Sequence, residues 1–224
     1  DIIKDVKQKG LASPLLQSHP DWEIVRTFVI NSIDIHLPSS AMIVCDALKT
    51  YEKTFTPRRR ARLEDEVEAF HNAGGIVVFT KWVRMKDTVC DSTNEVGGDD
   101  MFLETHSDFF EKLKPFVEEE RTLHTVHEDA FAATIRSATD VSQVPNQLDS
   151  FLISKKVKTL VIVGTYAEAC VQATARTAGT KGYNPIVLEP AIGYENQRLA
   201  YTHLQQISYV NTFVTSNIKY SRNE

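Results

Sequence analysis

Short apolar runs alternate with amphipathic stretches along this chain from residue 41 onward. The runs are rich in β-branched residues and too short for helices, so each is predicted to be a buried strand. They cover residues 41–45, 76–80, 122–126, 160–163, 186–189 and 209–215. Between them, apolar residues recur at helical spacing, as Leu63, Val67 and Phe70 do. The predicted helices run from Pro57 to the Gly74-Gly75 pair, near 130–138 and 146–155, and over 170–181 and 195–208.

Strands that alternate with helices predict an α/β fold, a Rossmann-like three-layer sandwich around a mostly parallel sheet. In such sheets the site lies at the carboxyl ends of the strands. The alternation covers residues 39–224, which we expect to form one domain. Residues 1–38 carry scattered prolines and are expected to form an N-terminal arm. Either the arm wraps the domain or a partner subunit, or it is a loosely ordered tail.

Composition narrows the class of protein. The chain has 224 residues, is 42% hydrophobic and carries a net charge of −5, which argues against nucleic-acid binding. It contains no apolar run of the roughly 18 residues needed to cross a bilayer, and its first residues do not resemble a signal peptide. Cys45, Cys90 and Cys170 fit neither a disulfide framework nor a zinc site, so a reducing, cytoplasmic location is expected.

The stretch 159–171 carries the strongest candidate chemistry. A buried strand ends at Gly164, a short loop follows, and Cys170 opens the next helical stretch. A cysteine at a helix start feels the positive end of the dipole, which lowers the thiol pKa. Free backbone N–H groups there could hold an oxyanion. The alternative is a structural cysteine packed beneath a loop.

Other polar residues lie near predicted strand ends. Asp46 directly follows the first strand and could accept a thiol proton, or it could simply cap a turn. Trp82 and Arg84 could stack on a flat substrate and bind its carboxylate, or they could form a solvated rim. His124 and His127 flank the third strand end, where structural histidines are common. No cluster has metal-ligand spacing, and no glycine-rich phosphate loop is present.

The motif Val163-Gly-Thr-Tyr-Ala-Glu-Ala-Cys-Val171, followed by Thr174 and Ala175, resembles the cysteine signature of the isochorismatase-like cysteine hydrolases. The strand that ends at Asp46 and the Asp129-Ala-Phe131 segment occur in the family's order. The likeness covers about residues 40–216. It implies a six-stranded parallel sheet with helices on both faces, a homodimer or larger homo-oligomer, a small-molecule substrate and no cofactor or metal.

The resemblance also implies roles for individual residues. Cys170 would be the nucleophile and Asp46 the base, and Thr125 stands where the family has its catalytic lysine. A cis peptide would fall at Thr165–Tyr166, with the N–H groups of Tyr166 and Cys170 as the oxyanion hole. The predicted substrate-binding residues are Trp82, Arg84, Leu48, Phe131 and His127.

The chain departs from the family pattern at three positions. Thr125 replaces the lysine, Leu48 replaces a glutamine, and Ala167 replaces a threonine. A cation beside an Asp–Cys pair favours the thiolate, so its loss weakens thiolate formation. The metal-binding aspartate and histidines of the nicotinamidase branch are also absent.

Three hypotheses follow. The first is a cysteine hydrolase that acts on a small amide-type carbonyl compound through Cys170 and Asp46. The second is an isochorismatase proper, which hydrolyses a vinyl ether with Asp46 as the acid and does not need the thiol. The third is a degenerate, non-catalytic member of the family that binds a partner.

Overall fold

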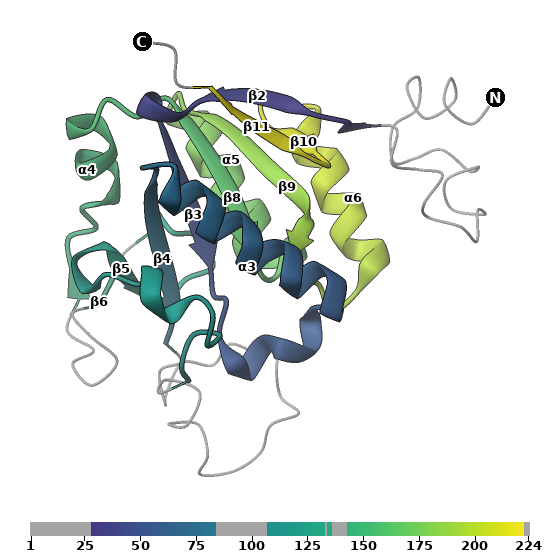
Figure 1. Ribbon diagram of the computed structural model, residues 1–224, viewed down its shortest axis with the longest axis horizontal. Helices are drawn as coiled ribbons and strands as arrows, with labels where there is room; N and C mark the ends of the chain where they lie inside the picture. Colours follow the sequence, from purple (N-terminus) through teal and green to yellow (C-terminus); the bar gives the residue numbers. More distant parts are fainter. Residues whose placement is uncertain (1–27, 84–106, 133, 136–142, 222–224) are drawn as a thin grey trace.

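The computed structural model describes residues 28–83, 107–132, 134–135 and 143–221 (Figure 1). Their main sheet has nine strands in the order β1-β10-β9-β8-β3-β4-β5-β6-β7. The strands are β1 (Val29–Ile30), β3 (Ser40–Cys45), β4 (Ile76–Trp82), β5 (Thr122–Thr125), β6 (Thr134–Ile135), β7 (Gln143–Val144), β8 (Thr159–Gly164), β9 (Asn184–Ile192) and β10 (Phe213–Thr215).

The α/β class with a mostly parallel sheet is confirmed. Every pairing from β1 across to β5 is parallel, and only β6 and β7 are antiparallel. The expected number of six strands is wrong, because β1, β6 and β7, each of two residues, extend the edges. The other six strands are the parallel ones predicted from the apolar runs.

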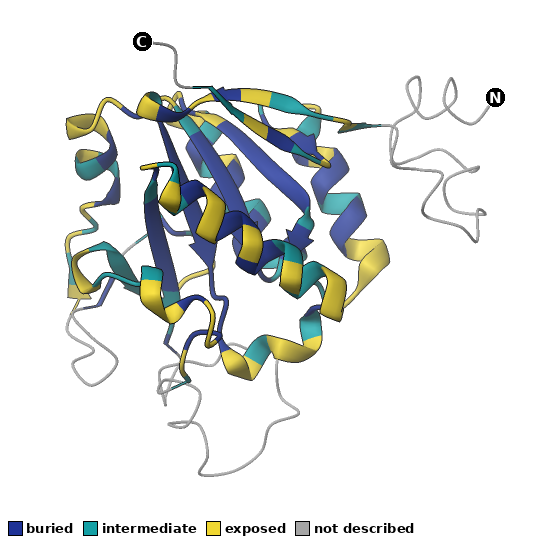
Figure 2. Ribbon diagram, in the orientation of Figure 1, coloured by how far each residue is buried: buried dark blue, intermediate teal, exposed yellow. Residues whose placement is uncertain are grey.

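Helices cover both faces of the sheet. On one face lies α3 (Pro57–Asn72), which contributes Leu63, Val67 and Phe70 to a core with Val77 and Phe79 of β4. On the other lie α4 (Leu148–Ser154), α5 (Gln172–Thr180) and α6 (Gln197–Ser208). The central strands are dark blue in Figure 2, since both of their faces are buried.

Local sequence explains where α3 begins. Thr56 caps it, accepting a hydrogen bond from the backbone N–H of Arg59 (3.3 Å), and Pro57 occupies the first helical position. A proline loses nothing there, because that N–H has no partner within a helix. The Gly74-Gly75 pair follows the helix end, and Gly74 has φ of +88°.

The structure corrects several predicted elements. The helix near 130–138 is wrong, because Thr134–Ile135 forms strand β6. The helical stretch at Cys170 is divided: Ala167–Val171 is a π-helical turn, and α5 begins at Gln172. The last strand covers only Phe213–Thr215 of the predicted 209–215.

Part of the predicted arm lies within the fold. Residues 1–27 lie outside the described residues, but β1 pairs with β10. Next along the chain, β2 (Ile33–His36) pairs with β11 (Ile218–Ser221) in a second, two-stranded parallel sheet. The boundary between residues 38 and 39 stays a prediction. No helix in the described ranges is both long enough and apolar enough to cross a membrane.

Candidate active site

The carboxyl ends of β3 and β8 meet at the centre of the sheet, where Cys45 lies beside Gly164. Asp46 directly follows β3, and the segment from Thr165 to Cys170 directly follows β8. The predicted nucleophile and the predicted base are therefore presented by neighbouring strands, as a parallel sheet requires of residues at the same edge.

Asp46 is buried, with 2% of its surface exposed, and has φ of +45°, a conformation that aspartate tolerates. Its Oδ1 accepts hydrogen bonds from Thr80 Oγ1 (2.8 Å) and from the backbone N–H of Trp82 (2.9 Å). Its own backbone N–H donates to Thr80 Oγ1 (3.1 Å). Burial raises the pKa of Asp46, and hydrogen bonds from Cys170, Thr80 and Trp82 oppose that rise.

The loop after β8 lies directly against the end of β3. Gly164 has φ of +106°, and a Cβ there would fall 2.0 Å from the Cys45 carbonyl oxygen, so only glycine fits. Thr165 N donates to that same oxygen (2.8 Å), and Gly193 N donates to the Gly164 carbonyl (2.8 Å). The Thr165–Tyr166 peptide is cis, as the resemblance implied.

Cys170 lies in the π-helical turn with 8% of its surface exposed. Its thiol lies close enough to the Asp46 carboxyl for each group to shift the pKa of the other, and the backbone N–H of Tyr166 also acts on the sulfur. Burial places the pKa of this thiol well above its ordinary value, the acids Asp46 and Cys45 raise it further, and the Tyr166 N–H lowers it. The pKa lowering expected from the helix start is therefore wrong, because burial and a neighbouring carboxyl outweigh the dipole.

Comparison with known proteins identifies the family of this chain. The model of the isochorismatase domain matches residues 40–218, which is most of the chain. The protein belongs to the isochorismatase family. No curated protein sequence gives a significant match.

Solved structures of the isochorismatase family have the same fold. A family protein from Burkholderia thailandensis has a TM-score of 0.61 at 19% identity, over 84% of this chain and 93% of that one. Nicotinamidase from Bacillus subtilis has a TM-score of 0.61 at 18% identity, over 79% of this chain and 99% of that one. N-carbamoylsarcosine amidase from Thermoplasma acidophilum has a TM-score of 0.58 at 19% identity, over 79% of this chain and 94% of that one.

Thr125, which the resemblance aligns with the family lysine, ends β5 and is buried, with 2% exposed. It pairs with Trp82, whose N–H contacts Asp46, and its carbonyl accepts from Val83 N (2.7 Å). In the part of the chain that the structure describes, every charged group that shifts the pKa of Cys170 is an acid. The isochorismatase site here is accordingly poor in positive charge among the described residues.

Lys81 and His124 are chargeable residues that directly precede Trp82 and Thr125 on their strands. They are neighbours on β4 and β5, and burial lowers the pKa of both. Side chains alternate along a strand, so Lys81 points to the same face as Phe79, which packs under α3. Cys170 packs on the opposite face, with α5 and α6. Neither side chain is on the side of the sheet that carries the thiol.

The predicted substrate-binding residues are not all brought to Cys170. Trp82 is half-buried and contacts Asp46 through its backbone. Leu48 is fully buried and bridges to Phe109 in the core under α3, which argues against contact with substrate. His127 is exposed in the turn after β5. Arg84 lies outside the described residues.

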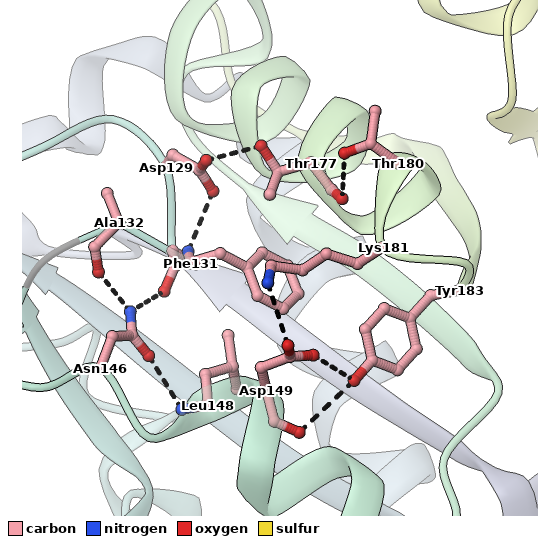
Figure 3. Close-up of polar contacts among 11 residues, drawn as sticks. Asp129, Phe131, Ala132, Asn146, Leu148, Asp149, Thr177, Thr180, Lys181 and Tyr183 are labelled. Atoms are coloured by element: carbon pink, nitrogen blue, oxygen red, sulfur yellow. Dashed lines mark hydrogen bonds and ion pairs between the residues drawn. The ribbon is translucent and has the colours of Figure 1, made fainter.

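Phe131 contacts two residues that follow α5 (Figure 3). Its ring stacks on Tyr183 (centroids 6.0 Å apart) and lies beneath the Lys181 ammonium (5.7 Å). Both residues follow the end of α5, whereas Cys170 precedes its start, and a nine-residue helix is about 13 Å long. Substrate contact for Phe131 stays a prediction.

The segment around Phe131 is tied to the helix that follows the nucleophile. Asp129 accepts from Thr177 Oγ1 (2.6 Å), and Ala130 N donates to Thr174 Oγ1 (3.1 Å), as Figure 3 shows for the first pair. The Thr174 side chain also lowers the pKa of the Cys45 thiol, against the rise that burial causes. The chain after β5 is thereby fixed against α5, one turn beyond Cys170.

Thr80 is one residue of the site that the sequence patterns did not indicate. A polar side chain at the end of a buried apolar strand was the available signal, since such a group needs a partner. Among the described residues, no group of three or more histidine, cysteine, aspartate or glutamate side chains could hold a metal ion. The arrangement offers a buried thiol, a carboxyl base and backbone donors.

Proposed function

We propose that this member of the isochorismatase family is a cysteine hydrolase that cleaves the amide-type bond of a small carbonyl compound. The observation that carries the proposal is the juxtaposition of the Cys170 thiol and the Asp46 carboxyl at the ends of β8 and β3, where each group shifts the pKa of the other and the Tyr166 N–H acts on the same sulfur. Two proteins of similar structure are named an amidase and a nicotinamidase, which supports an amide substrate.

In the first step, the Cys170 sulfur attacks the substrate carbonyl carbon while Asp46 takes the thiol proton. The carbonyl oxygen becomes an oxyanion, which the N–H groups of Tyr166 and Cys170 are proposed to bind. The C–N bond then breaks as Asp46 returns the proton to the leaving nitrogen. A thioester on Cys170 and a free amine or ammonia result.

In the second step, water attacks the thioester carbon and Asp46 takes one of its protons. The thioester C–S bond breaks, the acid leaves, and the proton returns to the Cys170 sulfur. The sum is amide plus water giving acid plus amine. The raised pKa of Asp46 suits this cycle, since it makes the carboxylate a stronger base than an ordinary aspartate.

The substitution of Thr125 for lysine changes how the nucleophile is activated. With acids around the thiol, the resting pair is a neutral thiol that donates to a carboxylate. The thiolate character is then generated only during attack, by transfer of the proton to Asp46. This favours substrates with a reactive carbonyl, because the protonated thiol of the free protein is a weaker nucleophile than a thiolate.

The test uses three variants and a panel of small primary and secondary amides. Cys170→Ala and Asp46→Asn are expected to abolish turnover, and the panel substrate should leave an acyl mass on the Cys170 peptide of the wild type. Cys45→Ala is the matched control, because Cys45 is a second buried thiol beside the site. Full turnover in folded Cys170→Ala would overturn the proposal.

A second candidate is vinyl-ether hydrolysis of isochorismate. The raised pKa of Asp46 favours it, because this carboxyl is protonated more readily than an ordinary aspartate and could deliver that proton to the methylene carbon. In that case Cys170→Ala keeps activity and Asp46→Asn loses it. A folded protein that turns over neither class of substrate would support the third hypothesis, a non-catalytic binding member.

We also propose a homodimer or larger homo-oligomer in the cytoplasm. Large apolar side chains are exposed on and after α6, including Leu199, Val210 and Phe213, which supports burial against a second copy. Cys45 and Cys170 are free thiols, in keeping with a reducing compartment. Light scattering of the purified protein tests the assembly, and a monomeric mass would contradict it.

A further inference from the structure

Glu168 stands in the same π-helical turn as Cys170 and connects this turn to α6. Its Oε1 accepts hydrogen bonds from the backbone N–H groups of Glu195 and Asn196, both at 2.9 Å. Its backbone carbonyl accepts from His203 Nδ1 within α6, also at 2.9 Å. Side chain and main chain of one residue therefore bind the start and the body of the same helix.

The helix does not need Glu168 for its own capping. Asn196 already caps α6, since its side chain accepts from Leu199 N (3.0 Å). The second oxygen of Glu168, Oε2, is buried and lacks a hydrogen-bond partner among the described residues. A buried carboxylate oxygen without a partner costs stability, so Glu168 is a poor choice if capping were its only use.

The turn, by contrast, needs external support. It contains a hydrogen bond from Val171 N to Tyr166 O (3.1 Å), the wide spacing of a π-helix, which is rare and frequently found at functional sites. Relaxation to an ordinary α-helical turn would rotate Cys170 away from Asp46. Ala167 N also bonds the Gly193 carbonyl (2.8 Å), which holds the turn at its first residue. Glu168 supports the same turn two residues before Cys170.

We propose that Glu168 is a positioning residue, which keeps the Cys170 sulfur against Asp46 and the Tyr166 N–H by binding the two backbone N–H groups that precede α6. The idea deepens the proposed function, on which its catalytic meaning rests. Its direct consequence is a buried, shielded thiol in the free protein. Loss of the contact therefore releases the turn and exposes the thiol.

The test measures alkylation of Cys170 by iodoacetamide at pH 7.5, followed by peptide mass spectrometry. Glu168→Ala is expected to speed the reaction about tenfold, the effect of lowering the thiol pKa by about one unit. Glu168→Gln keeps an oxygen for both N–H groups and should restore the wild-type rate. If Glu168→Ala does not fold, Glu168→Asp carries the test, since it keeps the charge but shortens the reach by one methylene.

Asn196→Ala is the matched control, because it removes a cap from the same helix without touching the turn. It should lower the melting temperature while leaving the alkylation rate unchanged. The proposal is overturned if Glu168→Ala and Glu168→Asp alkylate within about twofold of the wild type, or if Asn196→Ala accelerates equally. Alkylation requires no substrate, so it can be measured even if no amide is turned over. Failure of this proposal can therefore be distinguished from failure of the proposed function.

Discussion

Replacing Thr80 with valine tests the electrostatics of Asp46 directly. The two side chains have nearly the same shape, and Thr80 is 3% exposed, so the change mainly removes the hydroxyl. Two bonds are lost: the one donated to Asp46 Oδ1 (2.8 Å) and the one accepted from Asp46 N (3.1 Å). The first stabilises a charged group and contributes about 2 kcal/mol, and the second about 1 kcal/mol.

Only the first of these contributions depends on pH. The pKa of Asp46 is raised in the folded protein, so stability falls as pH rises from the unfolded value of about 3.9 through the folded value. Thr80→Val removes a donor that favours the carboxylate, so it raises that folded pKa further and deepens the loss above it. The destabilisation is expected to be about 3 kcal/mol at pH 8.5 and to shrink toward about 2 kcal/mol at about pH 3.5, where Asp46 is protonated and the first bond is a neutral one.

Urea unfolding of both proteins at the two pH values measures this difference. Thr215→Val is the control, because Thr215 is fully buried and its hydroxyl donates to the neutral carbonyls of Ile30 (2.9 Å) and Asn217 (2.8 Å). Its cost should be the same at both pH values. Equal costs for Thr80→Val at pH 8.5 and at about pH 3.5 would refute the assignment of a hydrogen bond to a charged Asp46.

Three further outcomes are expected. Asp46→Asn removes a negative charge beside Cys170 and should lower the pKa of that thiol, seen as faster alkylation at pH 8; a slower reaction would contradict this. Thr125→Lys should also lower the Cys170 pKa, because a cation favours the thiolate, whereas Thr125→Met, of similar length, should not; equal alkylation rates would count against it. Gly164→Ala should cost more than about 3 kcal/mol in urea unfolding, since its Cβ meets backbone, while Gly182→Ala, also at positive φ but with nothing within 4 Å, should cost about 1 kcal/mol; similar costs would disprove the steric argument.

The sequence predicted the central strands and the strand ends that carry Asp46 and Cys170. These succeed because continuous β-branched runs leave little choice but a buried strand. The stretch near 130–138 failed because its contacts are not local: Asn146 binds the carbonyls of Ala130 and Ala132, and Thr174 binds Ala130 N. Helical propensity is a weak preference that such tertiary bonds override.

The chemistry of the site was less predictable than its location. Position at a helix start suggested an acidic thiol, but the pKa of Cys170 depends on burial and on Asp46, which is distant in the sequence. Glu168 gave no signal either, because its partners Glu195 and Asn196 lie 27 and 28 residues away. Patterns identify elements, whereas charge and hydrogen bonding at a site follow from which elements meet.

The pairing of β2 with β11, side by side in Figure 1, has a consequence for the order of folding. Ile33 pairs with Ile218, and the bond from Thr215 to Ile30 on the neighbouring pair spans 185 residues. Closing so long a loop is entropically costly until the intervening sheet has formed. We therefore expect β3, β4 and β8 to assemble first and β1 and β2 to dock last. During synthesis on the ribosome, β1 and β2 therefore remain unpaired until β10 and β11 have emerged.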